Sequence, residues 1–246
     1  MTKLPVSIFI LTLNEADRLP KTLRSVPWAD EILVIDCGST DGTIDAAEAS
    51  GARVIRHPWE GYSRQKSFAL TQCRHPWVLW LDADEEVTVE LAHSIRKAME
   101  SETTAGGFAM ARRTVYLGKA LRWGGWYPDW KTRLFLKDKV RFDERMVHET
   151  AVIDGRVERL RGDLLHYSYR NLTHHLEKIN EYTTLWAEGA PGRPALPDLI
   201  FRPPAKFLKA YILKLGFLEG WRGLVVATMG AYYVALKYAK LFEKYK

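Results

Sequence analysis

The sequence has few of the features that mark several common classes of protein. Its 246 residues include only two cysteines, Cys37 and Cys73, which form neither a metal-type spacing nor a disulfide framework and indicate a reducing cytoplasm. There is no internal repeat and no low-complexity tract. The apolar run VSIFILTL at 6–13 is short and is followed directly by Asn14-Glu15, which is typical of a first strand rather than a signal peptide.

Acidic residues are scarce near the C-terminus. Residues 202–246 have a net charge of +7 and residues 1–201 a net charge of −1, so the overall +6 comes from a tail. A proline-rich stretch, PGRPALPDLIFRPP at 191–204, separates the two. We therefore expect a globular domain at 1–190, a connection at 191–204 and a basic amphipathic helical tail at 205–246. Nucleic acid is not an expected partner, because the charge lies in an apolar tail and the body lacks an aromatic–basic motif.

The body alternates between apolar runs and segments with helical spacing. Strands are predicted at 6–13, 31–38, 52–57 and 77–84. Strands that alternate with helices imply βαβ units, and hence an α/β fold. We expect a mostly parallel, Rossmann-like central sheet flanked by helices, with a C-terminal helical extension. Ligands of such sheets bind beyond the carboxyl ends of the strands.

Acidic residues lie at the carboxyl ends of two of these predicted strands. Asp82 and Asp84 are two residues apart, so in extended backbone both point to one side, and such hard oxygen ligands suit Mg²⁺ or Mn²⁺. The alternative is that Asp84 caps the next helix while Glu85 and Glu86 complement its dipole. For Asp36 the alternative is also structural: it would be a turn residue whose side chain accepts hydrogen bonds from its own backbone.

Three motifs stand at these strand ends: LTLNE at 11–15, VIDCGSTDGT at 34–43 and WLDAD at 80–84. In this order and at these intervals they closely resemble the family 2 glycosyltransferases of the GT-A fold, over most of the first 150 residues. The resemblance implies a nucleotide-sugar donor and a divalent metal, Mg²⁺ or Mn²⁺, that bridges its diphosphate. It assigns the donor to Thr12, Leu13, Asn14, Glu15, Asp36, Gly38, Ser39 and Asp82, and the metal to Asp84 and Asp82.

The segment GYSRQKSFAL at 61–70 takes the place of the family's donor-side helix. The asparagine that is usual there is not apparent. Arg64, Gln65 and Lys66 are therefore candidate contacts of the diphosphate or the base, and the alternative is that they are solvated surface charge.

The acceptor side resembles the family in KTRLFLKDKVRFDERMVHET at 131–150, where His148-Glu149 replaces the usual Glu-Asp pair. Transfer to a hydroxyl needs a base, and Glu149 is the candidate, with His148 positioning it or a substrate. The alternative is a surface glutamate beside a packed histidine. Asp129 is the second candidate base. The Gln-x-x-Arg-Trp motif of processive synthases is missing, which predicts one sugar per encounter.

Two further groups lie around and beyond these motifs. Trp123, Trp126, Tyr127 and Trp130 could form an acceptor platform, because flat rings stack on sugar faces, or they could be ordinary core and lid packing. His166, His174 and His175 lie beyond the motifs. His174-His175 begins a helical pattern, and both are predicted to be structural because no metal-ligand spacing argues otherwise.

The pair His148-Glu149 and the basic C-terminal helices together look like the lipopolysaccharide inner-core heptose β-1,4-glucosyltransferase subgroup. That resemblance implies an inverting, metal-dependent, non-processive enzyme that transfers a hexose, glucose from UDP-glucose, to a lipid-linked acceptor. The enzyme would be cytoplasmic and peripherally associated with the anionic inner face of the plasma membrane. The alternatives are a transferase acting on polyprenyl phosphate, capsule or another cell-envelope glycan, or a non-catalytic nucleotide-sugar or membrane-binding protein.

Overall fold

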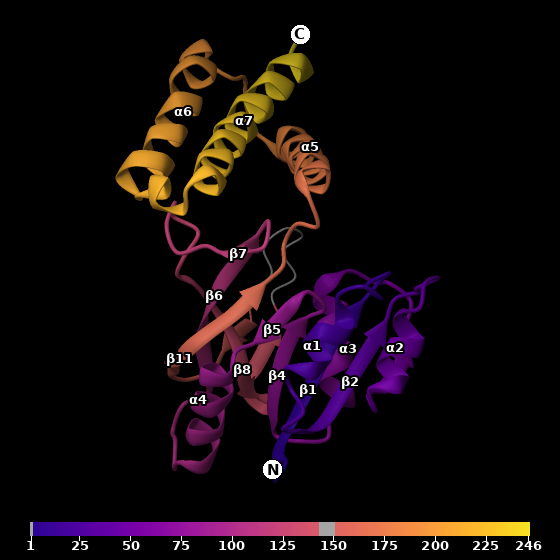
Figure 1. The fold of residues 1–246 in the computed structure, drawn as a ribbon. Coiled ribbons are helices and arrows are strands. Elements are labelled where there is room, and N and C mark those ends of the chain that lie inside the picture. The colour runs from indigo at the N-terminus through magenta and orange to yellow at the C-terminus, as the bar shows by residue number, and fades with distance from the viewer. Residues whose placement is uncertain (1, 143–150) are drawn as a thin grey trace. The chain divides into compact units, whose positions relative to one another are not determined.

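The computed structural model describes residues 2–142 and 151–246, and these group by their contacts into two compact units (Figure 1). Unit 1 comprises Met1–Arg112 and Asp129–His166, and unit 2 comprises Arg113–Pro128 and Tyr167–Lys246. The candidate base Glu149 and its neighbour His148 lie outside the described residues. The predicted limits of domain, connection and tail stay a prediction.

A large mixed sheet is the frame of unit 1. Its first half is parallel, in the order β3 (Arg53–Arg56), β2 (Ala29–Asp36), β1 (Leu4–Thr12) and β4 (Trp77–Asp82). It continues with β8 (Asp129–Leu136), β6 (Gly107–Tyr116), β11 (Val157–His166) and β5 (Glu85–Val87). Antiparallel pairing begins between β4 and β8. The predicted α/β class, a sheet flanked by helices and followed in the sequence by C-terminal helices, is confirmed.

Both faces of the parallel strands are covered by other elements. Side chains of β1 alternate between the faces. Ile8 and Ile10 pack with residues of α1 (Leu19–Arg24), α2 (Thr43–Ala49) and α4 (Val89–Glu100). Phe9 packs on the other side with residues of α3 (Tyr62–Gln72) and β9 (Val140–Phe142), and β9 pairs with β10 (Ala151–Ile153). Two buried faces explain why these strands have unbroken apolar sequences.

The carboxyl ends of β1, β2 and β4 lie level with one another. Thr12 of β1 pairs with Asp36 of β2, and Leu11 of β1 pairs with Asp82 of β4. The helix that follows β1 begins only at Leu19, because the residues directly after the strand form a loop in which Asn14 has a left-handed φ of 55°. The sheet therefore presents its polar motifs on three adjacent loops.

Unit 2 consists mainly of helices. They are α5 (Leu172–Gly189), α6 (Leu196–Leu208) and α7 (Trp221–Lys244), with a π-helical turn, η2 (Lys209–Leu213), and a 3₁₀ turn, η3 (Gly216–Glu219), between α6 and α7. Both α5 and α6 pack on α7. The short strand β7 (Lys119–Ala120) pairs with the end of β6. Tyr116, Leu121 and Val226 form a small core in this unit.

The proline-rich stretch predicted to be a connection is helical from Leu196 onward. Pro197 lies in the first turn of α6, where the missing N–H costs no hydrogen bond, and the helix continues through Pro203 and Pro204. Among the helices that the structure describes, none combines the length and the apolar character needed to cross a bilayer.

Candidate active site

The loops after β1 and β2 are joined by reciprocal hydrogen bonds. The backbone N–H of Asn14 donates to Oγ of Ser39 at 2.9 Å, and its Oδ1 accepts from the backbone N–H of Thr40 at 2.9 Å. The backbone N–H of Glu15 donates to Oγ1 of Thr43 at 2.8 Å. A short polar side chain that tolerates φ > 0 is what position 14 needs, which gives the asparagine of LTLNE a structural reason.

Asp36 organises the second of these loops. Its Oδ1 accepts from the backbone N–H groups of Gly38 (3.0 Å) and Ser39 (2.9 Å), and its Oδ2 accepts from the hydroxyls of Ser39 (2.5 Å) and Thr12 (3.1 Å). Only 1% of Asp36 is exposed. The turn-forming role that the sequence left open is therefore the one that the structure displays. Gly38 has φ 107°, which a residue with a side chain rarely adopts.

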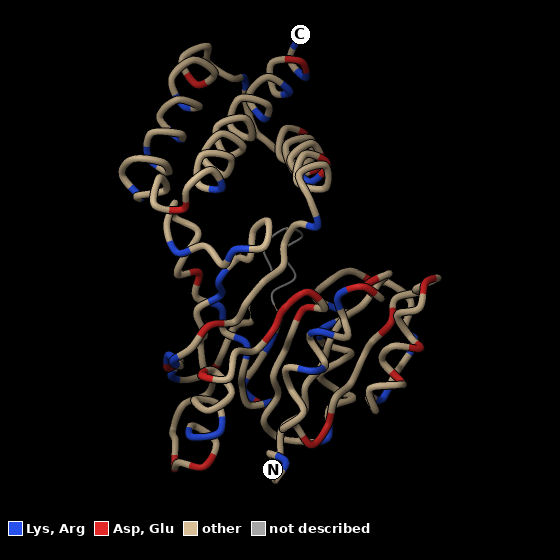
Figure 2. The backbone as a smooth tube through the Cα atoms, viewed as in Figure 1, with Lys and Arg blue, Asp and Glu red and all other residues tan. Residues whose placement is uncertain are grey.

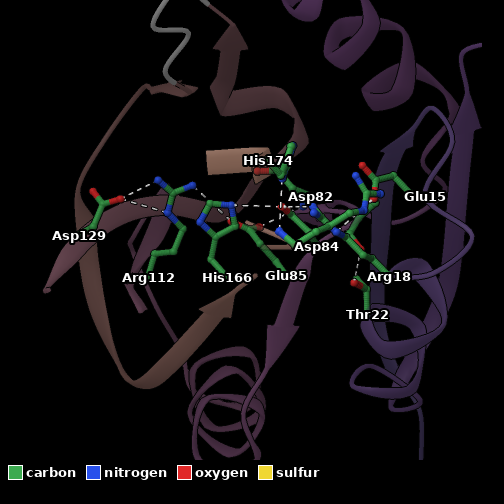
Figure 3. Close-up of polar contacts among 12 residues, drawn as sticks. Glu15, Arg18, Thr22, Asp82, Asp84, Glu85, Arg112, Asp129, His166 and His174 are labelled. Carbon is green, nitrogen blue, oxygen red and sulfur yellow. Dashed lines mark hydrogen bonds and ion pairs between the residues drawn. The ribbon is translucent and has the colours of Figure 1, made fainter. Parts of the chain in front are cut away.

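Asp82 and Asp84 both lie at the end of β4, and basic side chains contact each of them (Figure 3). Oδ2 of Asp82 accepts from Nη2 of Arg133 at 2.5 Å, and its Oδ1 accepts from the Trp80 indole at 3.1 Å. Oδ2 of Asp84 accepts from Nη1 of Arg18 at 3.1 Å and lies 3.5 Å from Nε2 of His166.

The helix-cap alternative for Asp84 is wrong. Thr88 is the N-cap of α4, and its hydroxyl accepts from the backbone N–H of Leu91 at 3.3 Å. Glu85 and Glu86 belong to the short strand β5, so they do not lie in the first turn of a helix. Asp84 therefore stands in a turn between two strands, at the loop edge of the sheet.

A chain of ion pairs runs through unit 1 from Asp82 to Asp129. Nη2 of Arg133 contacts both Asp82 and, at 2.7 Å, Oε1 of Glu85. The same glutamate oxygen lies 3.7 Å from Arg112, whose Nε and Nη2 donate to Oδ2 of Asp129 at 3.0 and 2.8 Å. Glu85 and Arg133 are buried, at 1% and 3% exposed, so this chain fixes side chains that solvent does not reach.

Two acids in this series of ion pairs, Asp82 and Glu85, have pKa values shifted in opposite directions. Burial raises the pKa of Asp82, but the charges of Arg133, His166 and Lys66 outweigh it, and the pKa lies below its usual value. Burial also raises the pKa of Glu85, and the adjacent charge of Asp82 adds to the effect, so that the pKa of Glu85 stays above its usual value. The site therefore holds Asp82 as a carboxylate.

Two buried cations lie against the Trp80 ring. The Lys66 ammonium lies 3.9 Å and the Arg133 guanidinium 3.7 Å from the ring centroid. Lys66 is 4% exposed, so the surface-charge alternative is wrong for it. Gln65 is also buried and donates to the His57 carbonyl and to Sγ of Cys37, both at 3.1 Å, whereas Arg64 is exposed.

The predicted acceptor residues fall into separate environments. Both oxygens of Asp129 are engaged, Oδ2 by Arg112 and Oδ1 by Lys131 at 3.1 Å. In unit 2, Trp126 packs edge-on against Tyr116 in an aromatic cluster, whereas Trp123 is 40% exposed. Trp126 therefore follows the packing alternative. Trp130 of unit 1 carries the Arg159 guanidinium 4.5 Å from its ring centroid.

Several N–H groups at this edge are buried without a hydrogen-bond partner among the described residues. They are Nη2 of Arg18 and the Nε and Nη1 groups of Arg133. Buried N–H groups of this kind suit phosphate oxygens, which accept hydrogen bonds from guanidinium groups. The residues also fit a divalent metal. Within the described part of the chain no three His, Cys, Asp or Glu side chains form a metal cluster, and Mg²⁺-type ions use one or two carboxylates together with substrate phosphates.

Four residues of this site were not among the sequence-based candidates. Arg18 and Glu85 stand next to motifs, and that adjacency is the signal that could have found them. Arg133 comes from β8, far along the chain. His166, which lies beyond the motifs, faces Asp84. No spacing in the sequence links these last two to the aspartates.

This geometry defines a class of protein. Polar loops, two carboxylates and buried cations at the carboxyl edge of an α/β sheet are the groups with which nucleotide-dependent transferases bind phosphate-containing ligands. The chain belongs to glycosyl transferase family 2, whose model matches residues 7–152. The predicted family and enzyme class are confirmed: this protein is a glycosyltransferase.

Relatives match over nearly the whole length of the chain. The lipopolysaccharide core biosynthesis glycosyltransferase LpsC of Rhizobium meliloti (strain 1021) is 35% identical over 260 residues, which cover 99% of this chain and 94% of LpsC. An uncharacterized glycosyltransferase of Rickettsia bellii (strain RML369-C) is 30% identical over 253 residues, covering 97% and 86%.

Solved structures are similar at a lower level. Residues 1–349 of S. aureus TarS in complex with UDP-GlcNAc give a TM-score of 0.48 at 15% identity, covering 100% of this chain and 91% of that one. Glucosyl-3-phosphoglycerate synthase of Mycobacterium tuberculosis, with Mn²⁺, UDP and glucosyl-3-phosphoglycerate, gives 0.47 at 18% identity, covering 76% and 81%.

Proposed function

We propose that this glycosyltransferase moves a hexose, glucose from UDP-glucose, onto a lipid-linked acceptor such as the lipopolysaccharide inner core. The transfer is inverting, metal-dependent and limited to one sugar per encounter, and it takes place at the inner face of the plasma membrane. The observation that carries the proposal is the meeting of Asp82, Asp84, Arg18 and Arg133 at the end of β4, in a chain related over its full length to LpsC.

The donor would lie along the loops that follow β1 and β2. Thr12, Leu13, Asn14, Glu15, Asp36, Gly38 and Ser39 belong to these loops or to the strand ends before them. Because Asp36 uses both oxygens within its loop, we assign it the shaping of the nucleoside pocket, with exposed groups of Asn14 and Gly38 nearest the ligand. Arg18 and Lys66 would bind diphosphate oxygens, since each carries its charge close to the end of β4.

Asp84, with Asp82, would hold the divalent metal. When bound, Mg²⁺ or Mn²⁺ supplies positive charge that neutralises the departing diphosphate. Arg133 keeps Asp82 ionised and oriented. Arg18 and His166 contact Asp84 and hold its side chain in position. The protein thus places cations around the leaving group before the donor arrives.

Transfer with inversion needs a base on the acceptor side. The acceptor oxygen forms a bond to the anomeric carbon while the bond from that carbon to the diphosphate oxygen breaks. The acceptor proton passes to a carboxylate, and UDP leaves with the electron pair. We assign the base to Glu149, with His148 beside it, because both oxygens of Asp129 are already held by Arg112 and Lys131.

A donor panel tests the first half of the proposal. Thermal unfolding is measured with UDP-glucose, UDP-galactose, UDP-GlcNAc and GDP-mannose, each with Mn²⁺, Mg²⁺ or EDTA. A specific ligand at one hundred times its dissociation constant stabilises the fold by about 2.7 kcal/mol. We expect the largest shift with UDP-glucose and a metal ion, and a panel in which UDP-glucose gives none contradicts the proposed donor.

An acceptor panel tests the second half. Radiolabelled glucose transfer is followed to lipid-linked inner-core oligosaccharide, to polyprenyl phosphate and to capsule precursors. We expect label in the core oligosaccharide, one sugar per acceptor. Label in polyprenyl phosphate or capsule material alone would replace the proposed acceptor while leaving the donor assignment intact.

A further inference from the structure

The connection between α6 and α7 in unit 2 exposes a dense group of large apolar side chains. Between Leu208 and Leu224 the chain makes a π-helical turn, a left-handed residue at Leu215 and a 3₁₀ turn. Six exposed members of this group are Leu208 (56%), Ile212 (48%), Leu213 (75%), Phe217 (44%), Leu218 (50%) and Trp221 (56%). We call this group the apolar turn. A cluster of this kind on one connection is unusual for a surface in contact only with water.

The exposed charged side chains around the apolar turn are all positive. Lys209 and Lys214 lie within it and are exposed, and Lys206 precedes it. Between Asp198 and Glu243 the only acidic residue is Glu219, and it is 4% exposed. Figure 2 shows the Lys and Arg positions along these helices. The solvent-accessible charge of this part of unit 2 is therefore positive.

Glu219 is neutralised inside the unit. Its Oε2 lies 2.7 Å from Nζ of Lys119, and its Oε1 accepts from the backbone N–H groups of Arg122 (2.6 Å) and Trp123 (2.9 Å). Burial raises the pKa of Glu219, but these partners outweigh it and the pKa lies below its usual value. The one acid in the segment thus forms internal bonds instead of adding negative charge to the surface.

The same contacts join the apolar turn to the loop that carries Trp123. Besides Glu219, the carbonyl of Lys214 accepts from the backbone N–H of Gly124 at 2.8 Å. A Cβ on Gly125 would lie 3.4 Å from Cγ of Lys214, so the loop and the turn are in close contact. Any surface that binds the apolar turn therefore also orients the Trp123 loop.

We propose that the apolar turn inserts into the interfacial region of an anionic lipid bilayer, with Lys206, Lys209 and Lys214 at the phosphate level. Exposed leucine and aromatic side chains with flanking lysines, and no exposed acid, are the combination that such a surface recognises. The charge complementarity favours anionic lipid over a neutral apolar partner. This inference makes the membrane association of the proposed function specific to one segment, and it does not depend on which sugar is transferred.

Vesicle binding of the full chain tests the inference with matched variants. Leu213→Glu removes the most exposed leucine of the turn, and Val89→Glu changes a residue of equal exposure (76%) at the start of α4 in unit 1. On vesicles of equal parts phosphatidylglycerol and phosphatidylcholine, we expect Leu213→Glu to bind about tenfold more weakly and Val89→Glu to bind like the unmodified chain.

The electrostatic contribution is tested with a second pair. Lys209→Gln with Lys214→Gln should weaken binding at low salt by about fivefold for each lysine, whereas Lys3→Gln with Lys97→Gln should have little effect. All variants should also bind pure phosphatidylcholine vesicles weakly, and raised salt should reduce the difference between the two lysine pairs.

Three outcomes would overturn the inference. The first is equal loss of vesicle binding in Leu213→Glu and Val89→Glu. The second is tight salt-independent binding to phosphatidylcholine alone. The third is a lipid-free dimer, seen by sedimentation, that Leu213→Glu dissociates while vesicle binding persists, which would assign the turn to a second copy of the chain. Stabilisation by UDP-glucose is measured on the same samples, so failure of the membrane inference is distinguishable from failure of the proposed function.

Discussion

Asp84 and Arg18 illustrate how one ion pair can serve a ligand that is itself charged. The 3.1 Å contact leaves Nη2 of Arg18 buried and without a hydrogen-bond partner among the residues described. A diphosphate would satisfy this N–H, and a metal ion would take up the charge of Asp84. The pair thus holds both side chains ready at the edge of the sheet.

We expect Asp84→Ala to lower transfer by at least about 100-fold, because a metal contributes several kcal/mol to leaving-group stabilisation. Metal-dependent donor binding should be lost while the melting temperature stays within a few degrees. Glu86→Ala is the matched control, since Glu86 lies two residues away and pairs with Lys21 at the surface. Unchanged activity of Asp84→Ala in EDTA would remove the metal from the proposal.

The base is tested by two isosteric changes. Glu149→Gln removes a proton acceptor without changing shape, so turnover should fall by about 10²–10⁴-fold while donor affinity persists. Asp129→Asn should have a smaller effect on turnover, because Asp129 is engaged by Arg112 and Lys131. Pre-steady-state kinetics with donor titration separates the two quantities. The reverse order of the two effects would transfer the role to Asp129.

The sequence predicted where the candidate site lies better than it predicted which residues form the site. Asp82, Asp84 and Lys66 were identified from motifs and strand ends, and they lie at one edge of the sheet because parallel strands bring their carboxyl ends together. Arg133 and His166 were not predicted, since they reach this edge through antiparallel strands from the second half of the chain. Strand pairing over such a distance is not encoded in local spacing.

At the scale of elements, strands were easier to predict than helix ends. The run at 77–84 contains β4, but the acidic residues after it form a second short strand, β5, because β11 offers an edge for pairing. The proline-rich stretch was predicted to be a connection from its composition. It becomes helix because α6 packs along α7, so tertiary contact outweighs a local preference.

The crossing of α4 and β11 provides a test of packing. Gly162 has φ 90°, and a Cβ there would lie 2.3 Å from the backbone N of Leu91. Gly162→Ala should therefore lower the free energy of unfolding by about 3 kcal/mol, through backbone strain and overlap together. Gly118→Ala is the control, because Gly118 has φ 79° but open space, and about 1 kcal/mol of strain is expected. Urea unfolding of both variants measures the two losses in free energy of unfolding. Equal losses would show that α4 moves to relieve the overlap.

At the scale of the whole molecule, stability should depend on pH through His175. Burial, with the nearby charge of His174, lowers the pKa of His175 to about 4 from the ordinary value of 6.5, and its Nδ1 lies 2.8 Å from the Tyr116 hydroxyl. Above pH 6.5 the imidazole is neutral in both the folded and unfolded states. As the pH falls from 6.5 to 4 the unfolded state takes up a proton first, so stability is lost in that window.

The loss should approach about 3 kcal/mol at the acidic end, given about 1.4 kcal/mol for each pKa unit. Urea unfolding at pH 7, 6 and 5, followed by tryptophan fluorescence, measures it. His175→Gln should be less stable at pH 7, because Tyr116 loses its partner, but should show a flatter dependence on pH. A slope identical to that of the unmodified chain would mean that other groups cause the acid sensitivity.

The order of the units along the chain has a consequence for evolution and for protein engineering. The backbone passes from one unit to the other after Arg112, after Pro128 and again after His166. Unit 2 therefore cannot be gained, lost or exchanged by a single recombination at the end of a gene. A chimera that exchanges unit 2 would have to replace residues 113–128 together with residues 167–246. A stop codon after residue 201 would leave residues 113–128 without the Glu219 and Val226 side chains that they contact.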